Sequence, residues 1–187
     1  SRSASEDFIL KQIDTLAEHD FKEIILTGIH IGQWGKDIDK TFLDLLVLLE
    51  EKSPINRIRM GSLNPLEITD DVLDFLSQSK KFCPHFHLSL QSANNNTLRR
   101  MNRFYTVEKY LEQIEDINKK FNLPFLGSDI IAGFVGETDD DFSNTVENLK
   151  KSGLTQIHTF PYSIRKGTIA EKLEGHVSDN VKEYRAS

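Results

Sequence analysis

Polar and apolar side chains alternate along residues 85–91, where histidine, serine and glutamine occupy every second position. Side chains of a strand point alternately to two faces, so His85, His87, Ser89 and Gln91 share one face. Parallel strands are normally apolar on both faces, because helices cover both faces of such sheets. The strand around His158 repeats this polar row. The row therefore predicts a water-filled functional interior of the fold or, alternatively, an edge strand that faces solvent.

The same histidines raise the question of a metal site. His85 and His87 with Asp129 and His158 would supply ligands of the kind found in metal-dependent hydrolases built on barrels. His85 lies at the start of its strand, away from the end at which α/β folds bind ligands. A metal-dependent barrel hydrolase is therefore an alternative and not the favoured interpretation.

Each expected strand ends in a short polar or glycine-rich segment. Ligands of α/β sheets and barrels bind at this end, and small residues there let backbone groups approach a ligand closely. One such segment is more simply a turn, but five in succession favour a ligand site. The segments are residues 27–30, 61–65, 91–94, 133–138 and 163–168.

Acidic residues around segment 133–138 indicate the charge of the ligand. A helix is expected to follow, and helix amino termini commonly bind phosphate. Glu137 and Asp139 to Asp141 would repel a phosphate, and Thr138 with Asp141 has the spacing of a capping box. A neutral or cationic ligand, such as a nucleoside or a sulfonium compound, fits better.

Periodic apolar residues predict the elements that position these segments. Helical spacing in residues 9–17 follows a capping Ser5, and strands then alternate with helices. Five strands separated by helices predict a parallel sheet, because parallel neighbours need crossovers of this length. The expected strands are residues 23–27, 57–62, 86–91, 125–132 and 156–162, and the expected helices are residues 42–49, 72–76, 97–101, 110–117 and 142–149. The tail after Ala170 is expected to be loosely attached.

Length and composition limit the class of protein. The chain has 187 residues, short of the roughly 250 of a closed eight-stranded barrel. A net charge of −6 opposes attraction to polyanions, so neither DNA nor strong RNA binding by this chain alone is expected. No apolar run approaches the roughly 20 residues that cross a bilayer. The single cysteine, Cys83, is expected to be a small buried residue in a reducing, cytoplasmic protein.

Five segments of the chain carry a recognisable pattern: ILTGIHIG at 25–32, FHLSLQS at 86–92, MNRFYT at 101–106, DIIAGFVGET at 129–138 and FPYSIRKGTIA at 160–170. Together they resemble the radical S-adenosylmethionine methylthiotransferases. The resemblance covers nearly the whole chain, and the first segment is most similar to the branch that modifies N6-threonylcarbamoyladenosine in tRNA. It implies an α/β fold, a partial (β/α)6 open TIM-like barrel of the radical SAM type with strands two to six present.

The family's cluster motif is absent from this chain. Members carry C-x-x-x-C-x-x-C, whose thiolates hold three irons of a [4Fe-4S] cluster and leave the fourth for S-adenosylmethionine. By the resemblance, these cysteines are expected upstream of Ser1. Residues 1–170 are then the core barrel without its first strand and cluster motif, and residues 171–187 are a tail leading to an RNA-binding domain. Clusters are expected in the full-length protein only, and this fragment alone is expected to be inactive.

The resemblance implies roles for residues that end the first strands of the chain. The methionine amino group of S-adenosylmethionine is expected near Gly28 and His30. The ribose is expected near Ser62 and Gln91.

Later strand ends complete the expected cofactor site. Adenine is expected against Gly133 and Phe134, and Asp129 is expected to orient the site from inside the barrel. Two positions depart from the family's pattern. Asn64 stands where the tRNA branch has an acid, and Ala93 stands where glycine is common.

Basic residues near these segments are candidates for RNA contacts. Arg99 and Arg100 cluster with Arg103, Arg165 and Lys166, and the last three are the expected substrate-binding residues. Charges solvated on a helix surface are the alternative. A tRNA partner is expected to bind through the full-length protein.

The resemblance implies a reaction on adenosine next to the tRNA anticodon. Reductive cleavage of S-adenosylmethionine gives a 5′-deoxyadenosyl radical, which abstracts hydrogen from carbon 2, where a methylthio group is installed. The loop at residues 27–32 favours the threonylcarbamoyl branch, because the sister branches usually carry Gln-Asn or Gln-Asp at Ile29-His30. The alternatives are the isopentenyladenosine or ribosomal-protein branch, the hydrolase, and a non-catalytic nucleoside-binding module.

Overall fold

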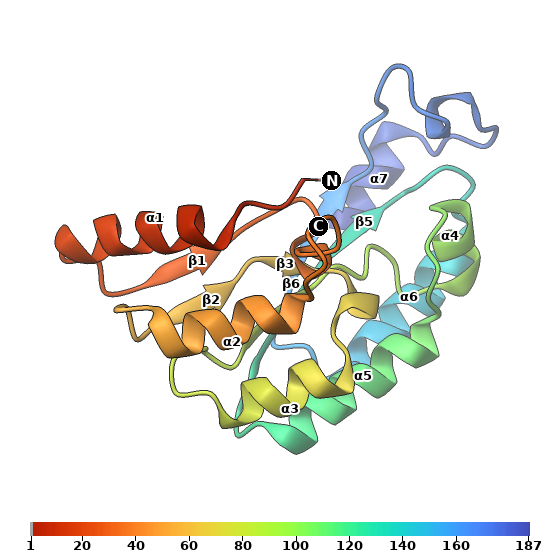
Figure 1. Ribbon diagram of the computed structural model, residues 1–187. Coiled ribbons are helices and arrows are strands. Elements are labelled where there is room, and N and C mark those ends of the chain that lie inside the picture. The colour runs from red at the N-terminus through yellow and green to blue at the C-terminus, as the bar shows by residue number, and fades with distance from the viewer. Residues whose placement is uncertain (1) are drawn as a thin grey trace. The chain divides into compact units, whose positions relative to one another are not determined.

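The computed structural model describes residues 2–187, in which helices alternate with strands (Figure 1). The chain divides into two compact units. The first contains residues up to His87 together with residues 117–125, and the second contains residues 88–116 and 126–187. Within each unit the neighbouring strands pair in parallel, as the crossover lengths predict.

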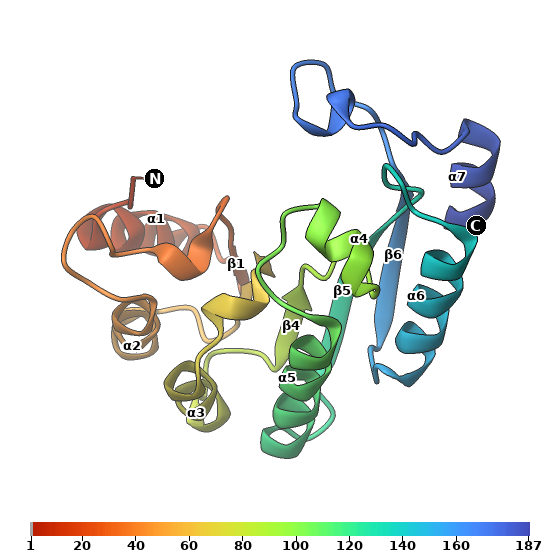
Figure 2. The same ribbon diagram turned by 90° about the vertical axis from the view of Figure 1, so that its right-hand side faces the viewer.

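The first unit confirms the predicted order of helices and strands. Helices α1, α2 and α3 lie on the same side of its strands (Figure 2). Ser5 caps α1 as predicted, since its side chain accepts a hydrogen bond from the N–H of Phe8. The elements are α1 (Glu6–Glu18), β1 (Ile24–Leu26), η1 (Ile31–Gln33), α2 (Phe42–Lys52), β2 (Ile58–Met60), β3 (Ser62–Leu63), η2 (Pro65–Glu67), α3 (Asp70–Gln78) and β4 (His85–Leu88).

The predicted strand at residues 57–62 is two strands, β2 and β3, because it changes partner at Gly61. β2 pairs with β1, whereas β3 neighbours β4. The Gly61 N–H donates to the carbonyl of Leu26 at 2.8 Å. A Cβ at residue 61 would lie 3.1 Å from that same oxygen, so glycine permits the close approach.

The core of the first unit is aliphatic and lies between the helices and the strands. Leu46, Leu49 and Ile58 are completely buried, and Met60 and Leu73 are nearly so. Burial of such side chains stabilises the unit by about 1.5–3 kcal/mol each relative to exposure. The helices therefore hold the strand ends of this unit in fixed positions.

The second unit continues the same pattern. α6 runs alongside β6, and α7 follows at the end of that strand (Figure 2). Thr138 and Asp141 form the predicted capping box of α6. The elements are α4 (Asn95–Arg100), α5 (Val107–Lys120), whose last residues belong to the first unit, β5 (Phe125–Ala132), α6 (Asp139–Lys151), β6 (Gln156–Pro161), η3 (Ala170–Lys172) and α7 (Asp179–Ala186).

The structure decides between the two interpretations of the polar row around His158. β6 is the edge strand of the order β3-β4-β5-β6, and every residue of it is exposed, including Ile157 and Phe160, so this strand faces solvent and has no buried face. One expectation about the end of the chain is wrong. The tail after Ala170 is not loosely attached throughout, because α7 contacts β6 and buries Lys182 and Arg185. No helix among residues 2–187 is long and apolar enough to cross a membrane.

Candidate functional site

Gln91 and Asp129 lie on neighbouring chain segments in the second unit. The Gln91 N–H donates to the Asp129 carbonyl at 2.9 Å, and the Gln91 carbonyl accepts from the Ile131 N–H at 2.8 Å. Gln91 has a φ of +70°, a left-handed conformation that is unusual for a residue with a side chain. Such strain concentrates at ligand sites, where the surrounding structure enforces it.

Hydroxyl groups in the core enforce the shape of the segment that leads to Gln91. The Ser128 hydroxyl donates to the Leu88 carbonyl at 2.7 Å and accepts from the Leu90 N–H at 3.2 Å, which interrupts the strand pairing. The Tyr105 hydroxyl donates toward the carbonyls of Ser89 and Leu90 at 2.7 and 2.9 Å. Burial raises the pKa of Tyr105 to about 12, so it remains a neutral donor.

Two adjoining cavities bring most of the expected cofactor residues of the second unit together. The first has a volume of about 530 Å³ and is lined by Gln91 and Asp129 with the end of β6 and Arg165. The second has a volume of about 620 Å³ and is lined by Phe134 with residues 99–103. Ile131 and Ala170 line both cavities. Volumes of this order suit a small organic ligand.

The loop at residues 133–137 is shaped by a buried carboxylate. Gly133 has a φ of +72°, and its N–H donates to Glu137 Oε2 at 2.7 Å. The Phe134 ring packs edge to face on Tyr162, with ring centroids 4.9 Å apart. The position of Glu137 just before α6 suggested that its carboxylate stabilises the helix dipole. Its side chain points into the loop at residues 133–137 instead.

Helix α7 supplies the partner of this carboxylate. Arg185 Nη1 lies 2.8 Å from Glu137 Oε2, and Arg185 Nη2 lies 2.6 Å from Asp139. Burial raises the pKa of Glu137, while the Gly133 N–H and Arg185 oppose that shift. The Gly136 N–H also donates to the Gly175 carbonyl at 2.8 Å. Residues 175–185 thus hold the loop, a role the sequence did not indicate.

In the first unit, the expected residues Gly28, His30 and Ser62 follow the ends of β1 and β2. All three are exposed, and β3 contacts η1, so their segments lie together. Asn64 has a structural role, because its side chain accepts from the Leu66 N–H at 3.1 Å and caps η2. The structure thus groups the expected residues in two sets, one in each unit.

The basic residues differ in their surroundings. Arg103 is half-buried in the second cavity, whose described lining contains three arginines and no acidic residue. Arg165 lines the first cavity, and the exposed Lys166 lines neither. Arg100 is already engaged, since it contacts the Gly136 carbonyl and Asp141. Arg103 is therefore the cation best placed for an anionic group of a ligand.

The histidines do not assemble a metal site. No three histidine, cysteine, aspartate or glutamate side chains within residues 2–187 lie close enough to hold a metal ion. The His85 ring stacks on Phe125, with centroids 4.5 Å apart, and burial lowers the pKa of His85. The geometric basis for a hydrolase is therefore missing from the described part of the chain.

Comparison with solved structures defines the fold. The fold matches coproporphyrinogen III oxidase from Escherichia coli with a TM-score of 0.73 at 20% identity, over 95% of this chain and 42% of that one. It matches methylornithine synthase with a TM-score of 0.66 at 14% identity, over 97% of this chain and 50% of that one. At these identities the likeness shows the fold alone, a partial TIM-like α/β barrel. The α/β fold expected from the sequence is confirmed.

The sequence comparison identifies the family. The model of the radical SAM superfamily matches residues 1–149, and the chain belongs to that superfamily. It is 38% identical over 186 residues to the threonylcarbamoyladenosine tRNA methylthiotransferase MtaB of Bacillus subtilis. It is also 38% identical over 186 residues to a tRNA-2-methylthio-N(6)-dimethylallyladenosine synthase of Clostridium botulinum. Both matches cover 98% of this chain and 41% of the relative, so the chain spans about two fifths of these relatives.

The superfamily implies S-adenosylmethionine and a [4Fe-4S] cluster as cofactors. The residues present fit S-adenosylmethionine. Gln91, with its strained backbone, lines the first cavity, and Phe134 and Arg103 line the second, whose described lining contains no acidic residue. The residues present do not fit the cluster. Three thiolates are needed, and the sequence contains one cysteine, the half-buried Cys83.

Proposed function

We propose that this chain is the S-adenosylmethionine-binding core of a tRNA methylthiotransferase that modifies carbon 2 of N6-threonylcarbamoyladenosine next to the anticodon. The observation that carries this proposal is the 38% identity across 98% of the chain to two kinds of tRNA-modifying relative. When bound, S-adenosylmethionine supplies the radical chemistry. The residues of this chain bind, orient and shield it.

The second unit would hold the nucleoside part of the cofactor. The Phe134 ring offers a flat apolar surface for adenine, and the left-handed turn at Gly133 brings backbone groups close to it. Gln91 and Asp129 line one cavity and offer amide and carboxylate groups to the ribose hydroxyls. The apolar wall between the cavities, formed by Ile131 and Ala170, would keep water from the reacting atoms.

The cationic residues of the second unit would contact anionic groups of the bound molecules. Arg103 faces a cavity with no acidic residue in its described lining, where a guanidinium favours a carboxylate or a phosphate. Arg165, in the other cavity, and its neighbour Lys166 would contact the RNA or the carboxylate that threonylcarbamoyl adds to adenosine. An isopentenyl group carries no charge and would make no such contact.

The choice of the threonylcarbamoyl branch rests on the loop at residues 27–32. The matches to the two kinds of relative have the same identity, so overall similarity does not separate the branches. Ile29 is 96% exposed and His30 is half-exposed at the end of β1, where they are available to a substrate. A loop in this position can sense the modified base.

Nucleoside analysis tests the proposed substrate. In cells that lack the full-length gene, mass spectrometry of digested tRNA should show loss of 2-methylthio-N6-threonylcarbamoyladenosine, with its unmethylthiolated precursor accumulating. The methylthio form of isopentenyladenosine serves as the internal control and should be unchanged. Selective loss of that control nucleoside would move the protein to the sister branch, and loss of neither would reject the proposal.

A further inference from the structure

Side-chain hydroxyl groups hold the backbone between β4 and Gln91 in place of a continuous strand ladder. After β4, pairing with β5 resumes only in an isolated bridge at Gln91. Between these points, the Tyr105 hydroxyl donates toward the carbonyls of Ser89 and Leu90 at 2.7 and 2.9 Å. The Ser128 hydroxyl accepts from the Leu90 N–H at 3.2 Å. Local interruptions of a ladder re-aim a side chain, and they are common beside ligand sites.

Gln91 is fixed on both sides of its left-handed turn. Its φ is +70°, which is unfavourable for a residue with a side chain. Its N–H donates to the Asp129 carbonyl at 2.9 Å, and its carbonyl accepts from the Ile131 N–H at 2.8 Å. The Gln91 side chain lines the first cavity together with Asp129. The contacts that precede Gln91 therefore decide the direction in which its amide group leaves the backbone.

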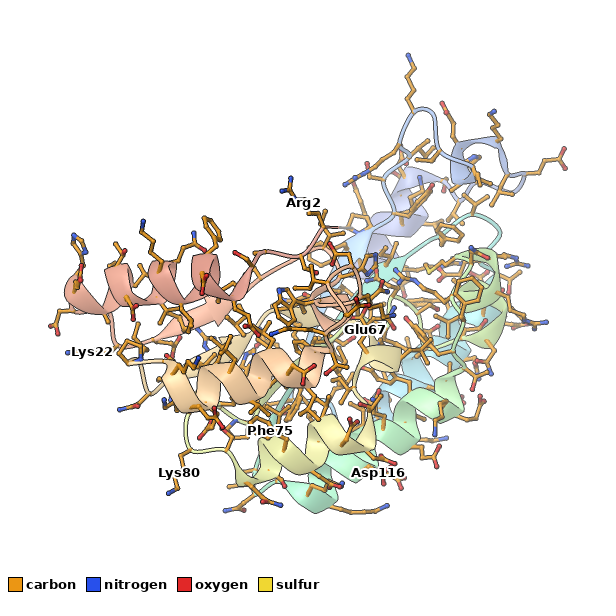
Figure 3. All side chains as sticks on the ribbon, viewed as in Figure 1. Arg2, Lys22, Glu67, Phe75, Lys80 and Asp116 are labelled. Atoms are coloured by element: carbon orange, nitrogen blue, oxygen red, sulfur yellow. The ribbon has the colours of Figure 1, made fainter. Side chains whose placement is uncertain are left out.

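Tyr105 reaches this segment from a loop that is itself well anchored. The Arg103 N–H donates to the Leu98 carbonyl at the end of α4, and the Val107 N–H donates to a side chain at the start of α4, both at 2.9 Å. α5 begins at Val107 and turns charged side chains such as Asp116 to its outer side (Figure 3). The Tyr105 side chain is buried, so its hydroxyl has a fixed position.

We propose that Tyr105 is a positioning residue which, with Ser128, holds Gln91 in the orientation in which its amide meets a ribose hydroxyl. The Tyr105 hydroxyl occupies the carbonyls of the two residues before Gln91, which keeps them out of a regular ladder with β5. Without this contact the segment can relax toward a regular strand, and a shift by one residue turns a side chain to the opposite face. This inference rests on the proposed function, in which Gln91 contacts the ribose of S-adenosylmethionine.

Replacing Tyr105 by Phe removes the hydroxyl and keeps the ring. Two ligands are compared on the full-length, cluster-containing enzyme by anaerobic calorimetry. 5′-Methylthioadenosine shares the nucleoside of S-adenosylmethionine and has both ribose hydroxyls, whereas its 2′,3′-dideoxy analogue has neither. The ratio of the Kd of the analogue to that of 5′-methylthioadenosine measures what the hydroxyls contribute. For Tyr105→Phe we expect this ratio to fall roughly 3- to 10-fold, the effect of one neutral hydrogen bond, while the Kd of the analogue changes less than about twofold.

Tyr110→Phe is the matched control, because Tyr110 is a second buried tyrosine whose hydroxyl donates to this stretch of backbone. That hydroxyl lies 3.2 Å from the Leu88 carbonyl, which also accepts from the Ser128 hydroxyl at 2.7 Å. The carbonyl therefore stays paired in the variant, and the ratio should change less than about twofold.

Two further variants keep the inference open to refutation. Gln91→Ala should lower the ratio as much as Tyr105→Phe, and the double variant should lower it no further, because the two residues act as one unit. Ser128→Ala removes the other hydroxyl that holds Leu90, and it should also lower the ratio, so the inference does not depend on Tyr105→Phe folding. Urea unfolding shows which variants are folded.

The outcomes separate the inference from the proposed function. An unchanged ratio in folded Tyr105→Phe or Ser128→Ala, an equal fall in Tyr110→Phe, or a further fall in the double variant would each overturn the positioning role. Equal weakening of both ligands by Tyr105→Phe would also overturn it, because that result describes a general structural loss. A wild-type ratio near one would reject the ribose contact of the proposed function, and the inference would fail with it.

Discussion

Replacing Arg185 by Met is expected to lower the free energy of unfolding by about 3 to 5 kcal/mol at neutral pH, because it leaves a buried carboxylate without its countercharge. The Arg185 and Glu137 side chains are 5% and 2% exposed, and their charged atoms lie 2.8 Å apart. The guanidinium also lies 5.3 Å from the centre of the Phe142 ring. Methionine fills a similar volume, so the lost energy reports mainly the lost charge.

The pH dependence of this loss follows from Glu137. Burial already raises its pKa above the ordinary value of 4.5, and removing Arg185 takes away an interaction that opposes the rise. A carboxyl whose folded-state pKa is raised favours folding at low pH and disfavours it as pH rises through that pKa. Urea unfolding should therefore show a larger difference between wild type and variant at about pH 8 than at about pH 5.

Two further variants make the result specific. Glu137→Gln removes the charge that Arg185 neutralises, so the double variant should be more stable than Arg185→Met alone at about pH 8. Tyr184→Ala is the control on the same helix, since Tyr184 is 78% exposed, and it should change stability by less than about 0.5 kcal/mol. A loss that is independent of pH, or that persists in the double variant, would contradict the role assigned to the ion pair.

Much of the fold follows from local signals in the sequence. Ser5 and the pair Thr138 with Asp141 mark helix starts, and both act as caps in the structure. Alternation along residues 85–91 also holds, because Phe86, Leu88 and Leu90 are buried while the residues between them are half-buried. These features depend on neighbours within a few residues, so the sequence alone reveals them.

The remaining features depend on contacts between distant residues. Glu137 and Arg185 are 48 positions apart, and neither spacing nor periodicity connects them. The left-handed backbone of Gln91 also has no local signature, because glutamine does not favour that conformation. Glu67 has no local signature of its surroundings either, since the loop at Gly32 packs on its side chain and His30 Nδ1 lies 3.7 Å from its carboxylate. Sequence patterns thus predict candidate strand ends for the site but not the distant residues that support them.

Replacing Gly133 by Ala should disrupt the loop at residues 133–137, because it strains the backbone and crowds α7 at the same position. The left-handed φ of +72° costs an alanine about 1 to 2 kcal/mol. The added Cβ would also lie 2.5 Å from Lys182 Cγ and 3.2 Å from Lys182 Cα, and such overpacking costs a further 1 to 3 kcal/mol or so. α7 and the loop at residues 133–137 cannot both keep their positions. We therefore expect the full-length enzyme to bind 5′-methylthioadenosine, which contains the nucleoside of S-adenosylmethionine, at least roughly tenfold more weakly.

Gly167 provides the matched control for stability. Its φ is +82°, but a Cβ there would meet no atom within 4 Å, so Gly167→Ala should cost only the backbone term of about 1 to 2 kcal/mol. Lys182→Ala removes the Cγ atom, and in that background Gly133→Ala should approach the cost of Gly167→Ala. Urea unfolding of the four variants measures these differences. If Gly133→Ala and Gly167→Ala lowered the free energy of unfolding equally in the wild-type background, α7 would not crowd the loop at residues 133–137, because the close contact with Lys182 is the difference on which the prediction rests.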